Sequence, residues 1–484
     1  MTSLQAEARL QARSDGAESG LKSKRAAKVA DRIVADVIEL GWPVGQILGS
    51  EAELLDRYQV SRAVFREAVR LVEHQHVAST RRGPGGGVVV TEPTVDAVTD
   101  AVVLYLYRVE APLDDVFEAR VVLEGIATAL ASARLDEQDR QRLRAFASGA
   151  SGQPEPRRDP RALHGLVASI ARNPALELFI AVLNRVAVLY SSGAQSFGPA
   201  VQAEISYAHA RIAAAIAAGD AEAAGRRMRK HLEAEAEYLR RRRSTRRLLP
   251  GSVVLLGQSG NSKRAEAVAR RITQAVVADG LRPGQFVGTE PQLIAREGVS
   301  RAVLREAVRL LEHHQIARMR RGPGGGLFVF EPSTAAVTDV TAIYLARRGM
   351  GLVDVAELRT GVEVALAELA AARITADGAA LLGAALNREA TAAPDEAADV
   401  GRDVHAAVAA VGDNRVLELV ALVLVRLSRI HQIERVPARA REHIRAEVLR
   451  AHQEIAAAIA SGDRELARDR MRAHLDALGA LTGR

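Results

Sequence analysis

The chain has 484 residues, of which 48% are hydrophobic and only 3% aromatic, and its formal net charge is +7. This length exceeds a single domain, and cores of Leu, Val, Ile and Ala favour helix-on-helix packing. The absence of cysteine excludes disulfides, thiolate chemistry and Cys-zinc sites. The positive charge is compatible with a polyanionic partner. No apolar run approaches the roughly 20 residues of a membrane span and no signal-peptide core is present, so we expect a cytoplasmic protein with no membrane partner.

The first expected elements are two helices separated by a turn. Residues 24–41 carry apolar side chains at helical spacing and lead into a turn containing Gly and Pro, which predicts the first helix. Ser50 followed by Glu53 has the spacing of a capping box, in which the two side chains satisfy each other's free backbone N–H groups. This box predicts a short second helix that ends at Tyr58.

A basic helix and a basic turn follow. Ser61 is a typical helix N-cap, and Arg62, Arg66 and Arg70 recur every four residues, so they share one helix face. Two further arginines and a Pro-Gly run then precede a short apolar segment, which predicts a turn between two strands. This order of elements is a winged helix-turn-helix, whose third helix enters the DNA major groove. The alternative interpretation is a solvated helix face. The candidate DNA-binding residues are Ser61, Arg62, Arg66, Arg70, Arg81, Arg82 and Gly83.

The same stretch occurs a second time. Ser300–Gly326 repeats Ser61–Gly87 without insertion or deletion, because both ends are displaced by 239 positions (300 − 61 and 326 − 87). Thr289 with Gln292 supplies the second capping box although both residues differ from those of the first. The fold is therefore expected in both copies. The candidate DNA-binding residues of the second copy are Ser300, Arg301, Arg305, Arg309, Arg320, Arg321 and Gly322.

The remaining sequence is helical in pattern after each copy. We therefore expect a mainly α protein with two winged helix-turn-helix domains, each followed by an all-α helical bundle. The expected segments are a disordered N-terminal segment at 1–22, winged helix-turn-helix domains at 23–92 and 263–331, all-helical domains at 93–240 and 332–484, and a linker at 241–262. The basic linker is either a solvated tether or a segment that contacts phosphate.

These motifs resemble the GntR superfamily of bacterial transcription regulators, specifically its FadR-like branch, in tandem duplication. In the first winged helix-turn-helix the motifs are Ser50-Glu51 with Leu54, Val60-Ser61-Arg62, Arg66-Glu67-Ala68, Arg82-Gly83 and Gly86-Gly87. In the first helical domain they are Arg120 with Glu124, Leu163-His164, Asn173, His209, Gly219-Asp220, Met228 and His231-Leu232. The resemblance implies dimers that bind double-stranded DNA at palindromic operators, and a helical domain that binds a small organic acid as effector. The family often has an arginine two residues after the capping Ser or Thr, where this chain has Ala52 and Pro291.

The resemblance also implies an effector site in each helical domain. Arg120 and Arg359 would clamp the effector carboxylate, for which a planar guanidinium is suited. Glu124 and Glu363 follow one turn later on the same helices. The alternative is an intrahelical Arg–Glu pair that binds no effector.

Histidines recur in register in both helical domains. His209 lies ten residues before Gly219 and His231 eleven after Asp220, so a helical hairpin turning there brings the two imidazoles level. The second domain has the same spacing, and a further histidine begins an earlier helix in each. The resemblance implies that three such histidines and a carboxylate hold a divalent metal of the zinc, nickel or manganese type. The alternative is satisfied polar residues of the core. The candidate metal ligands are His164, His209, His231, His405, His452 and His474.

The carboxylate that the family places four residues before the first of these histidines is missing in both halves. Pro160 and Gly401 occupy that position. Asp159 or Asp403 could substitute after local rearrangement, and three histidines with water or a ligand oxygen could also bind a metal.

Two DNA-binding domains in one chain predict an intramolecular pseudo-dimer, with a homodimer of the whole chain as a further alternative. The predicted recognition helices differ on the buried face, Phe65 against Leu304 and Val72 against Leu311, so we expect two near-identical half-sites.

Three functions remain to be compared. A ligand-responsive transcription regulator explains both the duplicated DNA-binding motifs and the histidines. A His-metal hydrolase would need a general base beside the histidines, which the spacing does not provide. An architectural DNA-binding protein would not need histidines held in register. No catalytic residue is therefore predicted.

Overall fold

The structure is a computed structural model. It describes residues 25–75, 77–81, 83, 85–148, 162–191, 198–242, 263–282, 284–313, 316–320, 322, 324–329, 334–392, 397–430 and 441–481. The segment predicted to be disordered at 1–22 and nearly all of the predicted linker lie outside these residues. The chain divides into two compact units, Met1–Val98 with Thr338–Gly349, and Thr99–Val337 with Met350–Arg484. No helix among the described residues is long and apolar enough to cross a membrane.

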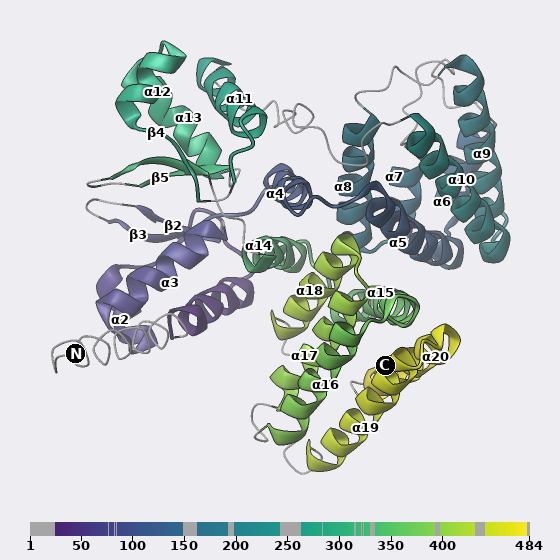
Figure 1. Ribbon diagram of the computed structural model, residues 1–484. Helices are drawn as coiled ribbons and strands as arrows, with labels where there is room; N and C mark the ends of the chain where they lie inside the picture. The colour runs from purple at the N-terminus through teal and green to yellow at the C-terminus, as the bar shows by residue number, and fades with distance from the viewer. Residues whose placement is uncertain are drawn as a thin grey trace, which may run out of the picture. The chain divides into compact units, whose positions relative to one another are not determined.

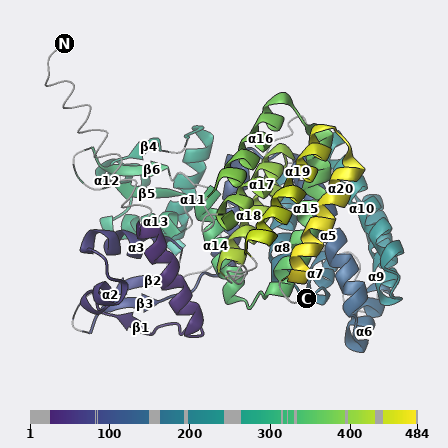
Figure 2. The ribbon, with the colours of Figure 1, turned by 90° about the horizontal axis from the view of Figure 1, so that it is seen from below.

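The first winged helix-turn-helix has the element order that the sequence predicts (Figure 2). A helix at residues 25–39 is followed by β1 (Ile47–Gly49), α2 (Glu51–Tyr58), α3 (Arg62–His74), β2 (Ala78–Arg81) and β3 (Gly87–Val90). The strands form an antiparallel sheet of order β1-β3-β2. Both halves of the predicted capping box are present, since Ser50 N–H donates to Glu53 at 2.7 Å and Glu53 N–H donates to Ser50 at 3.3 Å.

The second winged helix-turn-helix repeats this architecture (Figure 1). Its elements are α11 (Lys263–Ala278), β4 (Phe286–Gly288), α12 (Glu290–Glu297), α13 (Arg301–His313), β5 (Ala317–Arg320) and β6 (Gly326–Val329), with sheet order β4-β6-β5. Apolar side chains from α11, α12, α13 and the strands form its core. The capping box of Thr289 and Gln292 is complete here too.

The wing strands depend on a glycine where they approach β1. A Cβ atom on Gly87 would lie 2.4 Å from the carbonyl oxygen of Gly49, which is closer than any real contact of this kind. Gly326 meets Gly288 in the same way, at 2.8 Å from its carbonyl oxygen. The glycine run before each last strand therefore has a packing role besides its role in the turn.

The first helical domain is an antiparallel bundle around α5. Its helices are α4 (Val95–Arg108), α5 (Leu113–Arg134), α6 (Glu137–Ala147), α7 (Ala162–Ile170), α8 (Pro174–Ser191), α9 (Pro199–Ala217) and α10 (Ala221–Arg242). Helix α5 contacts α7, α8 and α10, and α9 turns back into α10 at Gly219, whose φ of 76° suits glycine. The hairpin predicted at this turn is thus present.

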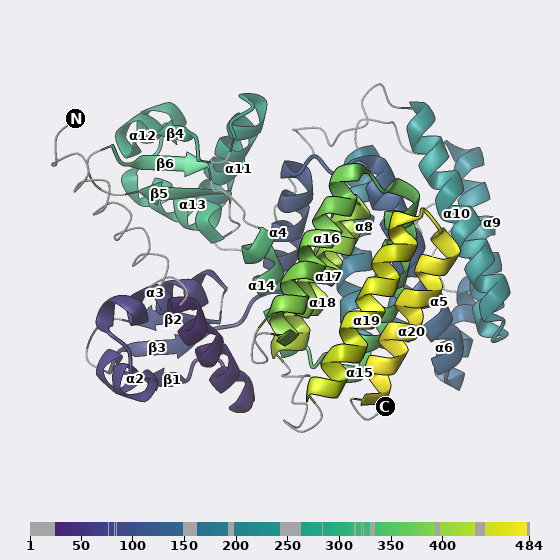
Figure 3. The same ribbon diagram turned by 60° about the horizontal axis from the view of Figure 1, so that its bottom comes forward.

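The second helical domain repeats the bundle around α15 (Figure 3). Its helices are α15 (Leu352–Arg373), α16 (Ala376–Thr391), α17 (Ala397–Val411), α18 (Arg415–Ile430), α19 (Arg441–Ala460) and α20 (Arg464–Leu481). Helix α14 (Thr334–Arg347) precedes them in the chain, and most of it belongs to the first compact unit. Helices α19 and α20 form the hairpin equivalent to α9 and α10, turning at Gly462. The predicted fold class, mainly α with two winged helix-turn-helix domains and two helical bundles, is confirmed.

Candidate DNA-binding and sensor sites

The arginines of α3 point away from the core of their domain. Val64, Phe65, Ala68 and Val69 are buried on one side of the helix. The opposite side carries the three arginines, all exposed, with Arg66 and Arg70 keeping about two thirds of their side-chain surface (66% and 68%). Such a face leaves the guanidinium groups accessible to phosphates and base edges.

Helix α13 presents the same face. Arg301, Arg305 and Arg309 are 64%, 68% and 76% exposed. A hollow of about 800 Å³ lies between α12, α13 and the wing, and Arg305, Arg309 and Arg320 are among its lining residues. The recognition helix and the wing therefore contribute cations to one concave surface.

The structure places the remaining predicted residues of this surface as follows. Ser61 and Ser300 accept from the N–H of Val64 and Val303 as N-caps. Arg81, Gly83 and Gly322 are exposed in the wings. Arg82 and Arg321 lie outside the described residues.

Two carboxylates, one at the start of the second helix of each winged helix-turn-helix, hold these arginines. Glu51 accepts from Arg66 at 3.1 Å, and Glu290 lies 3.1 Å from Arg301 and 3.6 Å from Arg305. Both glutamates stand at the first position of the second helix, directly before Ala52 and Pro291. These ion pairs neutralise part of the arginine face, and the exposed pair of Arg66 with Glu51 is worth about 0–1 kcal/mol.

Arg120 sits in a closed polar network of the first helical domain. Its Nε donates to Glu124 at 2.9 Å, its Nη1 to Glu235 at 2.8 Å and its Nη2 to Asn184 at 3.1 Å, and only 2% of its side chain is exposed. The intrahelical Arg–Glu pair considered from the sequence is present. Glu235 and Asn184 come from other helices and were not predicted.

Arg359 has a simpler environment. Its Nε donates to Glu363 at 2.5 Å, and no other described residue pairs with it. Its side chain is 14% exposed. Burial acts to raise the pKa of Glu363, but Arg359 and His405 outweigh this and lower it below its ordinary value.

The six predicted histidines form two buried clusters. In the first domain His209 Nε2 lies 3.0 Å from His231 Nε2, and His164 packs against both rings. In each cluster the ligand atoms of the three histidines lie within 4.8 Å of one another, as a shared ion requires. Burial lowers the pKa of His209 to about 2 and of His231 to about 4, so both imidazoles are neutral at pH 7 and their lone pairs can bind a metal.

In the second domain the three Nε2 atoms converge. His452 Nε2 lies 3.2 Å from those of His405 and His474, and these two are 3.4 Å apart. Two of these imidazoles have a carboxylate at Nδ1, the nitrogen that faces away from the converging Nε2 atoms. Glu363 lies 2.6 Å from His405 Nδ1, and Glu389 lies 2.8 Å from His452 Nδ1. A carboxylate at Nδ1 selects the tautomer that leaves the Nε2 lone pair free. Two such lone pairs at 3.2 Å repel each other unless a cation lies between them, so the donor set fits a metal.

The first domain has one such carboxylate among its described residues. Glu124 contacts Nδ1 of His164, and although burial acts to raise the pKa of Glu124, His164 and Arg120 lower it to about 2. Asp403, one sequence candidate for the missing ligand, instead pairs with Arg388 at 3.7 Å and is half exposed. Asp159 lies outside the described residues. The carboxylate that the structure brings to Gly401 is Glu389, whose Oε1 would lie 3.0 Å from a Cβ there.

The chain has two winged helix-turn-helix domains whose arginine helices face outward, and each is followed by a helical bundle with a buried polar centre. These features define a DNA-binding transcription regulator rather than an enzyme. The chain belongs to the gntR family of bacterial regulatory proteins, whose model matches residues 25–90 and 264–329. The FCD domain matches residues 115–234 and 354–477. The superfamily resemblance and the tandem duplication are therefore confirmed.

Individual relatives are more distant. A protein named as the HTH-type transcriptional regulator RmpR of Mycobacterium gastri is 28% identical over 114 residues, which are 24% of this chain and 42% of the relative. The chain thus spans less than half of that relative's length. Among solved structures, Streptococcus agalactiae GntR is 24% identical with a TM-score of 0.36 and covers 44% of this chain and 97% of its own. E. coli McbR/YncC is 17% identical with a TM-score of 0.23 and covers 46% and 98%. At TM-scores this low, neither structure bears on function.

Proposed function

We propose that the chain binds one operator with both of its winged helix-turn-helix domains, and that a small carboxylate effector in the helical domains changes the affinity for that operator. The observation that carries the proposal is the duplicated arginine face on α3 and α13, with the same three positions exposed in each. A solvated face without function would not require the N-cap, the turn and the wing to be repeated around it.

Operator binding would exchange one set of ion pairs for another. Glu51 holds Arg66, and Glu290 holds Arg301 and Arg305, through arginine side chains that are themselves about two thirds exposed. Phosphates carry full charges and DNA binding releases condensed counterions, so a duplex can displace weak carboxylate partners. Because the residues that differ between α3 and α13, Phe65/Leu304 and Val72/Leu311, are buried, both domains offer the same outward residues at these positions.

The two histidine clusters support a divalent metal of the zinc, nickel or manganese type. His164, His209 and His231 would hold one ion, and His405, His452 and His474 a second. Such an ion, when bound, supplies a Lewis-acid position for an effector oxygen. The chain's own residues supply the tautomer control, through Glu124, Glu363 and Glu389, and a guanidinium for the effector carboxylate at Arg359.

Selection from a randomised duplex pool tests the DNA part of the proposal. We expect the full chain to enrich sequences with two near-identical half-sites whose centres are about one helical turn, roughly 34 Å, or a multiple of it apart. Enrichment of a strongly asymmetric site, or of none, would contradict it.

Gel shifts on the selected duplex test the sensor part. They are run in chelated and metal-loaded buffer, with and without candidate carboxylates. A change in DNA affinity supports effector response. An affinity that stays constant under every condition would favour the alternative, an architectural DNA-binding protein.

A further inference from the structure

The β-sheet of the second winged helix-turn-helix carries aromatic rings on its outer face. Phe328 of β6 is paired with Phe286 of β4 on one side and with Arg318 of β5 on the other. Because side chains alternate along a strand, Arg320 lies on the same face as Arg318. The opposite face, which includes Leu327, belongs to the hydrophobic core. Two phenylalanines and two arginines therefore share the face that points away from this core.

The first sheet has a different outer face. The residues 239 positions earlier are Ile47, Val89, Ser79 and Arg81, and the strands pair them in the same register. Of the four side chains only the arginine nearest the turn is common to both wings. The two DNA-binding domains thus differ most in their wings, since the outward residues of their recognition helices are alike.

Phe328 holds the wing arginine of the second domain. The guanidinium carbon of Arg320 lies 4.3 Å from the centre of the Phe328 ring, well inside the range of a cation–π contact. Phe286 packs against Phe328 with ring centres 5.3 Å apart, and a Cβ atom on Gly326 would lie only 2.5 Å from the Phe286 ring. The glycine therefore leaves room for the ring that supports Phe328. In the first wing Arg81 instead donates to the carbonyl oxygen of Gly85, in its own turn, at 3.3 Å.

The contact orders Arg320 without neutralising it. Among the described residues Arg320 has no carboxylate partner, whereas Arg301 and Arg305 share Glu290. Arg320 also lines the hollow between α12, α13 and the wing. An arginine that is already held over a ring loses less rotamer freedom when it binds a phosphate, and it keeps its full charge for that phosphate.

We propose that Phe328 positions Arg320 to bind a backbone phosphate of the DNA, so that the second winged helix-turn-helix contributes more to DNA affinity than the first. Phosphate contacts carry no sequence information directly, so this difference changes how tightly a half-site is held and not which bases are read. The inference rests on the DNA-binding part of the proposed function and adds which domain binds more tightly and through which residue.

Fluorescence anisotropy of a labelled duplex with the full chain tests the inference. Phe328→Val installs the residue of the first wing and should weaken binding about 2- to 5-fold, as the loss of an exposed cation–π contact does. Phe328→Trp keeps an aromatic face and should bind as the unaltered chain does. Arg320→Gln should weaken binding more than Arg81→Gln, and it should lower the slope of log affinity against log salt by about 1, as the loss of one phosphate contact does. Equal losses in the two arginine variants, or an unchanged slope in Arg320→Gln, would overturn the proposal.

A double variant separates positioning from support of the sheet. If Phe328 acts through Arg320, Phe328→Val should have no further effect on DNA affinity once Arg320→Gln is present. Losses that add in the double variant would show that the ring only supports the wing, and this outcome contradicts the proposal. Circular dichroism melts establish that each variant folds.

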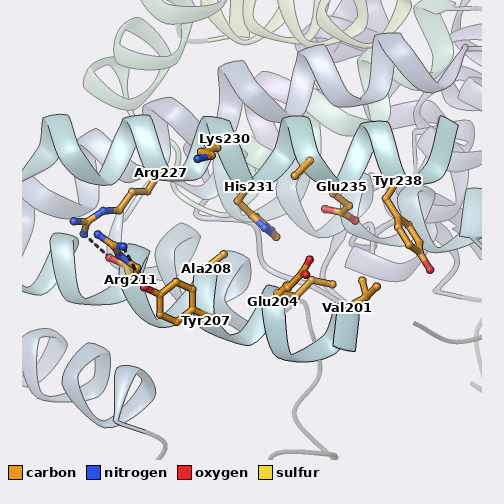
Figure 4. A pocket seen from close by; sticks show the side chains of 12 residues that line it. Val201, Glu204, Tyr207, Ala208, Arg211, Arg227, Lys230, His231, Glu235 and Tyr238 are labelled. Atoms are coloured by element: carbon orange, nitrogen blue, oxygen red, sulfur yellow. Dashed lines mark hydrogen bonds between the residues drawn. The ribbon is translucent and has the colours of Figure 1, made fainter. Parts of the chain in front are cut away.

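A second arginine–aromatic contact supplies the matched control. Figure 4 shows Tyr207 and Arg211 of α9 in the first helical domain, where the guanidinium carbon lies 5.7 Å from the ring centre and Tyr207 is 65% exposed. This contact is not part of either wing, so Tyr207→Val should bind DNA as the unaltered chain does. A loss as large as that of Phe328→Val would mean that Phe328 has no special role.

Two duplexes separate this inference from the proposed function. Every duplex offers phosphates, so Phe328→Val should weaken binding by the same factor on the selected operator and on a duplex of random sequence. If no operator is selected, the proposed function fails and the random duplex still tests the inference. Operator binding that Phe328→Val leaves unchanged contradicts the inference alone. A chain that binds neither duplex contradicts both.

Discussion

Arg373 Nη2 lies 2.6 Å from Oε1 of Glu118, so the last turn of α15 in the second helical domain is tied to α5 in the first. The reciprocal pair, Arg134 with Glu357 at 2.5 Å, joins the residues 239 positions away from these, since 373 − 134 and 357 − 118 both equal 239. The two helical domains therefore contact each other as two subunits of a symmetric dimer would. One chain supplies both sides of this interface.

The first prediction concerns the asparagines at the centre of this interface. Asn414 Nδ2 donates to the carbonyl oxygen of Asp115 at 3.1 Å and to Glu118 at 3.0 Å, while its Oδ1 accepts from the first turn of α18. Because Asn414 is fully buried, Asn414→Ala should lower the free energy of unfolding by about 1–3 kcal/mol. Urea denaturation followed by circular dichroism measures it.

Two further variants decide how this result is read. Asn173→Ala removes the equivalent contact, to the carbonyl oxygen of Asp354 at 3.0 Å, and should cost about the same, roughly 1–3 kcal/mol. Asn387→Ala, at an exposed position of α16, should change stability by no more than about 0.5 kcal/mol. Equal effects of Asn414→Ala and Asn387→Ala would show that the interface contributes little.

The interface also has an asymmetric contact, and this gives a prediction about pH. Asp115 accepts from the backbone N–H of Arg415 at 2.9 Å, but the residue equivalent to Arg415 in the first half is Pro174, which has no N–H. Burial raises the pKa of Asp115, nearby Glu118 on its own helix adds to this, and Arg415, 40% exposed to solvent, only partly offsets it. The folded protein therefore binds this proton more tightly than the unfolded chain.

Because the folded protein binds this proton more tightly, protonation of Asp115 stabilises the folded state. The contribution of Asp115 to the free energy of unfolding is lowest at pH values above the pKa of Asp115 in the folded protein. This contribution rises as the pH falls through that pKa towards the lower pKa of the unfolded chain. We expect the free energy of unfolding of the unaltered chain, minus that of Asp115→Asn, to increase between pH 7 and pH 4.5. Urea titrations at several pH values measure this difference, in which the other carboxyl groups cancel. A difference that decreases towards low pH would show that Arg415 outweighs burial.

Short-range patterns in the sequence predicted most of the scaffold. The capping boxes, the arginine period on α3 and the distances of His209 and His231 from their turn depend on spacing within one helix or one hairpin, which helical geometry fixes. Asp36 illustrates the limit. It accepts from the Tyr58 hydroxyl at 2.7 Å across two helices, and nothing in the local sequence indicates this pair.

The partners of the functional residues were missed for the same reason. Glu235 reaches Arg120 across 115 residues, and Glu389 reaches His452 across 63. One signal was available for Glu235, because it lies four residues after His231 and thus on the same helix face. No comparable spacing links Glu389 to a histidine, since it comes from a different helix.

The third prediction separates the arginine face from ordinary exposed arginines. Arg66→Ala and Arg305→Ala should each weaken binding to the selected operator by about 1–3 kcal/mol, and the double variant should lose more. Arg226→Ala is the matched control. Arg226 is exposed, helical and paired with a glutamate like the other two, although its partner lies one turn away on the same helix. Fluorescence anisotropy of a labelled duplex at fixed salt measures the affinities. If all three single variants bind alike, α3 and α13 carry solvated arginines and nothing more.

The last prediction concerns Glu389 and the second histidine cluster. Glu389 lies 2.9 and 2.8 Å from Nδ1 of His452 through its two oxygens, and it is buried. An uncharged amide would hold the imidazole less firmly and make it a weaker donor, so Glu389→Gln should lower zinc affinity at one of two sites about 10- to 100-fold. Calorimetric zinc titrations measure both sites in one experiment, and the first cluster serves as the internal reference.

Asp403→Asn is the control that distinguishes the two candidate carboxylates. Asp403 is only two residues from His405 in sequence, but it faces Arg388 and is half exposed, so this variant should bind zinc as the unaltered chain does. If Asp403→Asn weakens the second site and Glu389→Gln does not, the helix that begins at residue 397 must rearrange when zinc binds. Unchanged affinity in both variants would mean that His405, His452 and His474 hold the ion without help from either carboxylate.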